Sequence, residues 1–237
     1  MKIEILQLLD GASRATGLTV VIDVFRAFSM ACYLFENGAE AVYPVQKVEE
    51  AFSLQQKLKH PILIGERNER PIPGFHFGNS PTHILNHSFA GKSVIHTTSA
   101  GTQGLLRATG AQQRLTGSFV NAPAIIEYIQ HKKPEKVSLV CMGYSLLHPT
   151  EEDTLCAAYL YAGLKGLPFN LHQAIQTIRN SSGKRLFAPE NQPHSPATDF
   201  YLCLATGWFP YVLTVDESPL GPVLSVVDPK TGARVTR

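Results

Sequence analysis

The feature that most constrains this fold is a regular alternation of short β-branched runs with longer stretches whose apolar residues recur at helical spacing. The short runs predict strands at residues 3–9, 18–23, 41–45, 61–65, 93–97, 117–121 and 136–142. The longer stretches predict helices near residues 27–37, 47–59, 101–109, 122–132 and 151–165. Strands alternating with helices are typical of α/β proteins. We therefore predict a three-layer α/β/α fold around a largely parallel, mixed sheet.

Length and composition predict one soluble globular domain spanning residues 1–237. Of the 237 residues, 44% are hydrophobic and 17% are charged, and the net charge is only +2. Without a basic stripe, neither nucleic acid nor a membrane is an expected partner. The N-terminus does not read as a signal peptide, and the cysteines are scattered without metal-binding spacing. We expect a cytoplasmic protein with reduced thiols.

Two segments near the C-terminus depart from the alternation. Residues 181–198 are polar and rich in proline, which predicts a long loop, either mobile or folded over a site. Residues 222–237 predict a hairpin that turns at DPKTG and adds to the periphery of the sheet. The sequence leaves the oligomeric state open, and a homodimer is one arrangement that a chain of this size can adopt.

Charged and polar side chains follow several predicted strands at the point where each strand ends. Asp23 and Arg26 follow one run, Glu66 and Arg67 follow another, and Asn121 ends a third. Ligands of open α/β sheets bind beyond the carboxyl ends of the strands, so we expect these groups to share one rim. The alternative for the first pair is a simple salt bridge at a strand–helix junction.

The stretch TTSAGT at 97–102 is a candidate phosphate-binding loop. Backbone N–H groups at the start of a helix, together with small hydroxyl residues, can bind phosphate oxygens. The candidates are Thr97, Thr98, Ser99, Gly101 and Thr102. The alternative is an ordinary helix cap in which the threonines merely suit a turn.

Carboxylates at separate strand ends suggest a magnesium site. Mg²⁺ takes oxygen ligands, usually one or two carboxylates with waters and substrate phosphate. Asp23 and Glu66 are candidates, joined by Glu152 or Asp153 at the start of a predicted helix. The acids at that helix start are also explained by a favourable interaction with the helix dipole.

Several of these motifs occur together in an order that resembles the 2-phosphosulfolactate phosphatase (ComB-like) family. The resemblance spans nearly the whole chain and depends on many short motifs. They are VVIDVFRAF, FENGAEAVYPV, GER at 65–67, GFHFGNSP at 74–81, TTSAGT, FVNA at 119–122, EEDTLCAA at 151–158 and TDFYLCLATGWFPYV near the end. In relatives the threonine loop commonly reads TTTNGT, so an amide is missing here at Ala100.

The resemblance implies a Mg²⁺-dependent phosphatase that hydrolyses 2-phosphosulfolactate to sulfolactate and phosphate, a step towards coenzyme M. The catalytic candidates are Asp23, Arg26, Glu66 and Arg67. The substrate-binding candidates are Gly78, Asn79, Ser80, Thr97, Thr98, Ser99, Gly101, Thr102 and Asn121. The metal candidates are Asp23, Glu66, Glu152 and Asp153, and Asp199 completes the family pattern.

The expected mechanism has Arg26 and the 97–102 loop holding the phosphoryl group, while Arg67 and residues 78–81 orient the rest of the anion. Water activated by the metal, or an aspartate, attacks phosphorus. Haloacid-dehalogenase-type phosphatases carry a second aspartate two residues after the first, where this chain has Phe25, so we favour water. The alternatives are a phosphatase acting on another small phosphorylated hydroxy acid and a phosphoacid-binding module without turnover.

Overall fold

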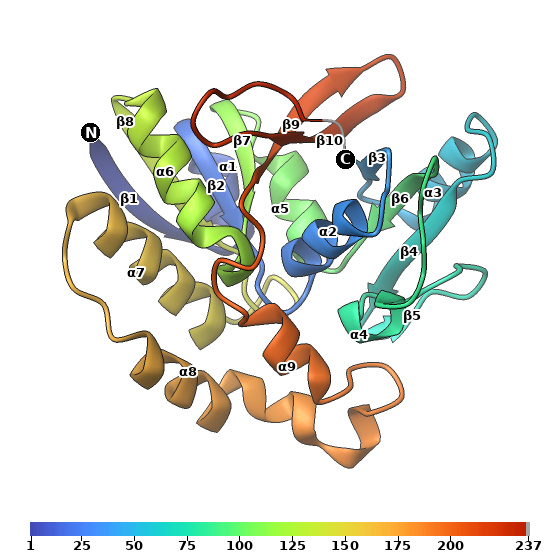
Figure 1. Ribbon diagram of the computed structural model, residues 1–237. Coiled ribbons are helices and arrows are strands. Elements are labelled where there is room, and N and C mark those ends of the chain that lie inside the picture. The colour runs from blue at the N-terminus through green and yellow to red at the C-terminus, as the bar shows by residue number, and fades with distance from the viewer. Residues whose placement is uncertain (236–237) are drawn as a thin grey trace.

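The computed structural model describes residues 1–235 and shows an α/β fold (Figure 1). The strands are β1 (Lys2–Gln7), β2 (Gly17–Ile22), β3 (Ala41–Pro44), β4 (Ile62–Arg67), β5 (Arg70–Pro71), β6 (Ser93–Thr97), β7 (Ala111–Gly117), β8 (Lys136–Cys141), β9 (Val212–Ser218) and β10 (Gly221–Val227). The α-helices are α1 (Leu8–Arg14), α2 (Ala27–Glu36), α3 (Val48–Gln55), α4 (Pro81–Ile84), α5 (Gly101–Arg107), α6 (Ala122–Lys132), α7 (Glu151–Lys165), α8 (Leu171–Asn180) and α9 (Thr198–Cys203). None of the helices in this described part has the length and apolar character that crossing a membrane requires.

Within residues 1–235, ten strands form one mixed sheet in the order β1-β8-β2-β7-β9-β10-β3-β6-β4-β5. The order contains two blocks of parallel pairing. In the first block, β1, β8, β2 and β7 run parallel to one another. In the second block, β3, β6 and β4 are parallel, with the short antiparallel β5 at the edge. The predicted fold class is thereby confirmed.

The antiparallel hairpin β9–β10 lies between the two blocks. β10 is the first strand of the hairpin predicted at 222–237, so the peripheral position predicted for that strand was wrong. β9 pairs with β7 at Leu115 and Thr214, and β10 pairs with β3 at Val42 and Leu224. The hairpin turns between Ser218 and Gly221, and the DPKTG turn leads only to an isolated bridge between residues 227 and 234. The last residues of the predicted hairpin, 236 and 237, lie outside the described residues. Apolar side chains on both faces explain why these strands suit the middle of a sheet.

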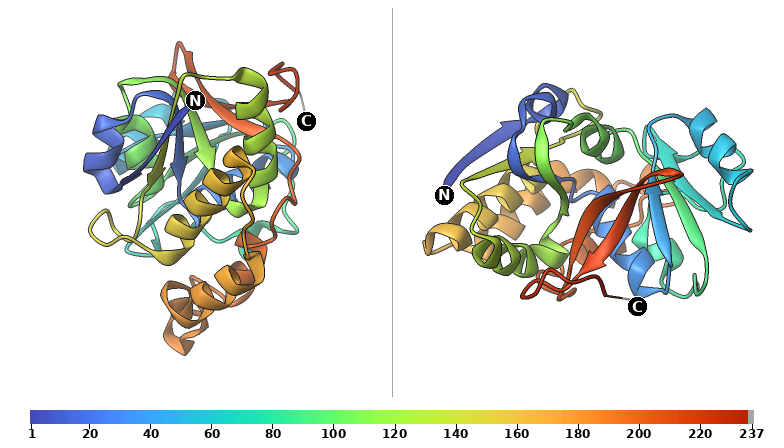
Figure 2. Two further views of the ribbon diagram at one scale, coloured as in Figure 1. Left: turned by 90° about the vertical axis from the view of Figure 1, so that its left-hand side faces the viewer. Right: turned by 90° about the horizontal axis from the view of Figure 1, so that it is seen from above.

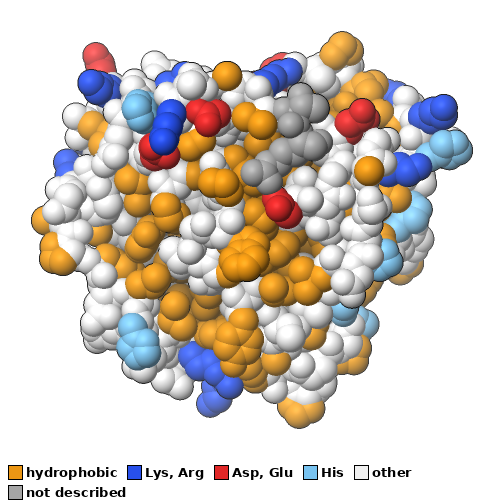
Figure 3. Space-filling model, viewed as in Figure 1, with side chains coloured by type: hydrophobic (Ala, Val, Ile, Leu, Met, Phe, Trp, Pro, Cys, Tyr) orange, Lys and Arg blue, Asp and Glu red, His pale blue; other side chains and the backbone are white. Residues whose placement is uncertain are grey.

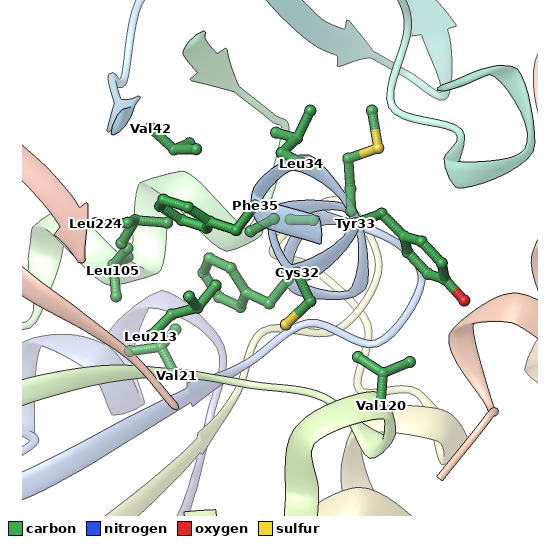
Figure 4. Close-up of a cluster of buried hydrophobic side chains, with 14 of the residues drawn as sticks. Val21, Cys32, Tyr33, Leu34, Phe35, Val42, Leu105, Val120, Leu213 and Leu224 are labelled. Atoms are coloured by element: carbon green, nitrogen blue, oxygen red, sulfur yellow. The ribbon is translucent and has the colours of Figure 1, made fainter. Parts of the chain in front are cut away.

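Alternating residues of β2 face two cores, one on each side of the sheet. Val21 packs into a core that contains residues of α1, α2 and α5 (Figure 4). Val20 and Ile22 pack into a second core with α6 and α7. Successive side chains of a strand point to opposite faces, and both faces here are covered by helices (Figure 2). This arrangement leaves the ends of the strands as the place where polar groups can gather.

Two boundaries near the site differ from the sequence prediction. The strand predicted at 117–121 is β7 at Ala111–Gly117, and Phe119–Asn121 forms a 3₁₀ turn. The Asn121 side chain accepts a hydrogen bond from the Ser118 N–H at 3.3 Å, which turns the chain into α6. The strand predicted at 3–9 ends at Gln7, because α1 begins at Leu8.

The segment 181–198, predicted as a long loop, contains two short 3₁₀ helices. They are η2 (Ser182–Phe187) and η3 (Pro189–Asn191), and α9 begins at Thr198. In Figure 1 the segment and its flanking helices α8 and α9 lie beneath the sheet, at the end towards which β2 runs. Figure 3 shows hydrophobic side chains across the middle of the same view, interrupted by an acidic side chain near its centre. The position of the segment brings it next to the strand-end residues.

Candidate active site

A pocket opens where strands of the two blocks end, and it collects several of the predicted residues. Asp23 and Arg26 reach it from the β2–α2 junction, Glu66 from the end of β4, and Ser99 from the loop after β6. The full lining is Asp23, Phe25, Arg26, Glu66, Glu69, Asn79, Ser99, Ala100, Gly143, Tyr144 and Ser145. The rim expected from the strand-end rule is therefore present in part, with Asp23, Arg26 and Glu66 but without Arg67 and Asn121.

Asp23 is a buried carboxylate held by the start of α2. Its Oδ1 accepts a hydrogen bond from the Ala27 N–H at 3.0 Å. Burial raises the pKa of Asp23 to about 7, the charges of Glu66 and Glu152 add to this effect, and the Ala27 N–H opposes it. A positive charge placed among these acids would stabilise the ionised form of all three.

Gly101 lets α5 approach Asp23 closely. A methyl group at this position would lie 2.6 Å from Asp23 Oδ2 and 2.6 Å from Ala27 Cβ. Any larger residue would therefore push α5 away from the carboxylate or turn the carboxylate. Glycine is required here for the close approach of α5 to Asp23.

Glu66 is fixed by hydrogen bonds from the loop after β6 and from its own turn. Its Oε1 accepts from the Ser99 N–H at 2.6 Å, and its Oε2 accepts from Ser99 Oγ at 3.0 Å and from the Glu69 N–H at 2.8 Å. Asn68 and Glu69 both have positive φ, which is the backbone of a tight hairpin turn between β4 and β5. The turn thus places a further acid, Glu69, at the pocket.

Arg26 forms its ion pair with Asp199, so the alternative that it simply pairs with Asp23 is wrong. Arg26 Nη1 donates to Asp199 Oδ2 at 2.7 Å and to the His194 carbonyl oxygen at 2.8 Å. Asp199 is held in turn by Ser80 Oγ at 2.8 Å and by the Thr82 N–H and hydroxyl. The Arg26 Nε and Nη2 groups have no acceptor within residues 1–235, so they can donate into the pocket that Arg26 lines.

Asp153 has a structural task. Its Oδ1 accepts from the Val24 N–H and its Oδ2 from the Gly143 N–H, both at 2.8 Å. Burial, reinforced by the charges of Asp23 and Glu152, raises the pKa of Asp153 well above its usual value. Asp153 therefore ties the loop after β8 to the loop after β2.

Glu152 lies outside the pocket lining and has one oxygen without a hydrogen-bond partner in the described chain. Its Oε1 accepts from Arg185 Nη2 at 3.1 Å, whereas its Oε2 is buried and has no hydrogen-bond partner in the described chain. An unsatisfied buried carboxylate oxygen is costly, which makes it a natural acceptor for a cation or an ordered water. The negative charge of Glu152 contributes to the raised pKa of Asp23.

The oxygen donors fit Mg²⁺, although they do not form a closed cage. In the described part of the chain, no group of three or more His, Cys, Asp or Glu side chains is arranged so that it could hold a metal ion. Mg²⁺ seldom needs such a group, because waters and substrate phosphate usually complete its coordination. Asp23 and Glu66 face one pocket, and Glu152, with its unpaired oxygen, lies outside the lining. This donor set suits a hard divalent cation.

Several predicted residues lie near the site but do not line the pocket. Arg67 donates to the carbonyl oxygens of Glu66 and Gln46 and to Thr97 Oγ1. Thr98 and Thr102 cap each other reciprocally, at 2.9 and 3.1 Å. The predicted residues outside the lining are Arg67, Gly78, Ser80, Thr97, Thr98, Gly101, Thr102, Asn121, Glu152, Asp153 and Asp199. The capping interpretation thus describes the threonines, and Ser99 and Ala100 are the parts of their loop that reach the pocket.

Sequence reasoning missed several residues at the site. Glu69, Gly143, Tyr144 and Ser145 line the pocket, and Arg185 from η2 forms ion pairs with Glu69 at 3.0 Å and Glu152 at 3.1 Å. The NE pair at 68–69 is a turn signal that could have located Glu69. Nothing local marks Arg185, because its partners are 116 and 33 positions away.

Comparison with known proteins identifies the family to which the chain belongs. A family model described as 2-phosphosulpholactate phosphatase matches residues 4–217. A protein of Caldicellulosiruptor saccharolyticus named probable 2-phosphosulfolactate phosphatase is 38% identical over 144 residues, which are 59% of each chain. One of the same name from Thermotoga maritima is 37% identical over 139 residues, again 59% of each chain.

A longer match comes from Bacillus subtilis, whose protein of that name is 29% identical over 212 residues, covering 89% of this chain and 92% of its own. The first two matches span less than two thirds of the relatives' length, but the family model covers most of the chain. The chain belongs to the 2-phosphosulpholactate phosphatase family.

Proposed function

We propose that this protein is a Mg²⁺-dependent phosphatase that converts 2-phosphosulfolactate to sulfolactate and phosphate. The observation that carries the proposal is the convergence of Asp23, Arg26, Glu66 and Ser99 on one pocket in a chain of this family. The relatives' names supply the substrate. As part of the same proposal, the product feeds coenzyme M synthesis in the cytoplasm, where the buried cysteine thiols would stay reduced.

The charge balance around the pocket favours a divalent cation. Asp23, Glu66 and Glu69 line the pocket, and the charge of Glu152 acts on Asp23 from outside the lining. Arg26 is neutralised by Asp199, and Arg185 is shared between Glu69 and Glu152. A phosphorylated acid would meet an excess of negative charge in this pocket. Mg²⁺ held by Asp23 and Glu66 would offset the charge on the phosphoryl oxygens.

The residues of the chain have separable tasks in the proposed reaction. Arg26 donates from Nε and Nη2 to phosphoryl oxygens, while its pairing with Asp199 holds the guanidinium in place. Ser99 and the turn at Glu69 fix the Glu66 carboxylate by three hydrogen bonds. Groups held in position before the substrate arrives lower the cost of orienting it.

We propose attack by water rather than by Asp23. A phosphoaspartate mechanism of the haloacid-dehalogenase type needs a second acid two residues on, and Phe25 occupies that position. Its ring packs against Phe200, with centroids 5.8 Å apart, and forms an apolar wall of the pocket. A phosphoaspartate detected by mass spectrometry after rapid quenching would contradict this part of the proposal.

The proposal is tested by phosphate release from phosphosulfolactate with and without EDTA. We expect activity to require Mg²⁺ and to fall by about 10³-fold or more in Asp23→Asn and Glu66→Gln, with both proteins still folded. Glu217→Gln is the matched control, because it removes a carboxylate from the exposed end of the ion pair with Arg114. Full activity in EDTA would refute the role of the metal.

A second candidate is a phosphatase acting on another small phosphorylated hydroxy acid. Ala100 lines the pocket and offers no polar group to the far end of a substrate. A panel of phosphorylated three-carbon acids distinguishes the two candidates by their kcat/KM values. Binding of these acids without phosphate release would instead indicate a non-catalytic module.

A further inference from the structure

Arg185, in the segment 181–198, lies outside the pocket lining itself but contacts three residues of that lining. Its side chain is 20% exposed and bridges Glu69 in the β4–β5 turn and Glu152 at the start of α7. The guanidinium carbon lies 5.6 Å from the centre of the Phe25 ring and 5.3 Å from that of Tyr144. Phe25, Tyr144 and Glu69 all line the pocket. Arg185 is therefore a cation at the pocket wall that the proposed chemistry on phosphate does not use.

The other arginines near the site make different contacts. Arg67 directs three of its N–H groups to Glu66 O, Gln46 O and Thr97 Oγ1. Arg26 lies beside Asp23 at the expected phosphoryl position. Among the arginines of residues 1–235, Arg185 is the one whose guanidinium lies over the rings of Phe25 and Tyr144 in the pocket lining.

Arg185 also has donors to spare. Its Nε donates to Glu69 Oε1 at 3.0 Å, its Nη2 to Glu152 Oε1 at 3.1 Å, and its Nη1 to the Ser182 carbonyl oxygen at 2.5 Å. A guanidinium has five N–H groups, so one on each terminal nitrogen has no acceptor within residues 1–235. Asn191 Nδ2 donates to the Arg185 carbonyl oxygen at 2.9 Å and steadies the backbone. The side chain is thus positioned without being saturated.

We infer that Arg185 is a specificity-determining residue that binds the carboxylate or sulfonate of the substrate at the end remote from the phosphoryl group. This inference rests on the proposed phosphatase function. The free N–H groups of Arg185 donate to the acid, and its positive charge offsets the repulsion from Glu69 and Glu152. The acid of the substrate then decides which phosphate esters are retained for hydrolysis.

The test compares three substrates that share a phosphorylated secondary carbon. They are 2-phosphosulfolactate, 2-phospholactate, which lacks the sulfonate, and 2-propyl phosphate, which lacks both acids. In Arg185→Gln we expect the ratio of kcat/KM for phosphosulfolactate to that for 2-propyl phosphate to fall by about 10- to 100-fold, mostly through KM. Because 2-phospholactate keeps the carboxylate but lacks the sulfonate, its kcat/KM in the two proteins shows which of the two acids Arg185 binds.

Two further variants separate recognition from folding. Arg185→Lys keeps the charge and should restore part of the lost ratio. Arg179→Gln is the matched control, because Arg179 stacks on Phe187 in the same region, 3.0 Å from the ring centre, and should leave the ratio unchanged. Thermal unfolding midpoints show whether each variant is folded. An equal loss for all three substrates in Arg185→Gln would overturn the inference.

A binding measurement keeps this inference separate from the proposed function. If the wild-type protein releases phosphate from none of the substrates, the proposed function fails. The role of Arg185 can then still be tested by calorimetry, which compares the affinity of the wild type and of Arg185→Gln for sulfolactate, an acid without a phosphate. Binding weakened about tenfold or more in Arg185→Gln supports the inference, and equal affinities contradict it.

Discussion

Arg26 and Asp199 form a buried ion pair across 173 positions of sequence, with 2.7 Å between Nη1 and Oδ2 and side chains only 3% and 0% exposed. The pair links the β2–α2 junction to α9, and Ser80 and Thr82 add hydrogen bonds from a third segment. Breaking a buried pair by removing one partner leaves the other charge unpaired, which is far costlier than losing an exposed pair.

We therefore expect Asp199→Ala to lower the free energy of unfolding by about 3–5 kcal/mol and to abolish activity, because Arg26 loses the carboxylate that orients it. Urea denaturation and phosphate release measure the two effects. Glu217→Gln, which breaks the exposed pair with Arg114, should cost less than about 1 kcal/mol. Similar losses in the two variants would contradict the structural role of Asp199.

The adjacent acids Glu152 and Asp153 should respond differently to amide substitution. In Asp153→Asn the new NH₂ group would face a backbone N–H of Val24 or Gly143, so the free energy of unfolding should fall by about 1–3 kcal/mol. Glu152→Gln should destabilise less, because only one of its oxygens is hydrogen-bonded, and should instead weaken the response to Mg²⁺. Denaturant unfolding and a Mg²⁺ titration of activity distinguish the two outcomes.

Gly101→Ala should inactivate the enzyme without unfolding it. The added methyl group would meet Asp23 Oδ2 and Ala27 Cβ, each 2.6 Å away, so the carboxylate or α5 must shift. We expect kcat/KM to fall by about 100-fold, since displacements of about 1 Å at a reacting centre have effects of this size. Gly110→Ala, whose methyl group would lie 3.0 Å from the Ala15 carbonyl oxygen outside the pocket lining, is the control.

His96 should make the fold sensitive to mild acid. Burial lowers the pKa of His96 to about 4 from its usual 6.5, and its Nε2 lies 3.0 Å from Asn79 Oδ1. A base with a depressed folded-state pKa stabilises the protein fully above pH 6.5, and this contribution is lost as the pH falls towards 4. The loss amounts to about 3 kcal/mol. The free energy of unfolding of His96→Asn should therefore differ less from that of the wild type at pH 4 than at pH 6.5. Urea unfolding measures this difference at both pH values, and an unchanged difference would contradict the role of His96.

The sequence predicted the parts of the site that depend on strand ends. Asp23 and Ser99 follow strands, and Glu66 lies near the end of β4. Parallel pairing of β4 with β6 brings Glu66 and Ser99 to one edge of the second block, and Asp23 meets them from the first. The prediction failed where long-range pairing decides. Arg26 finds Asp199 through a fold that the local sequence does not encode, and Arg67 turns to backbone carbonyls because those acceptors lie within its reach.

The fold prediction failed in the same way at β9 and β10. The apolar residues of β10 identify it as a strand. The pairing of β9 with β7 and of β10 with β3 joins segments that are far apart in the sequence, and the local pattern does not specify it. An alternating pattern specifies which side chains are buried and not which neighbour completes the sheet. Residues 222–237 were therefore predicted as a peripheral hairpin, although β10 (Gly221–Val227) lies in the middle of the sheet.

That central position of the hairpin links the site to the completion of protein synthesis. Asp23 stands in the first block and Glu66 in the second, and the strands that join the blocks come from residues 212–227. When synthesis has reached Asp199, the nascent chain contains every candidate site residue but neither of the two strands, β9 and β10, that join the blocks. A nascent chain stopped before Val212 thus carries the chemical groups of the enzyme without the strands that fix them opposite one another.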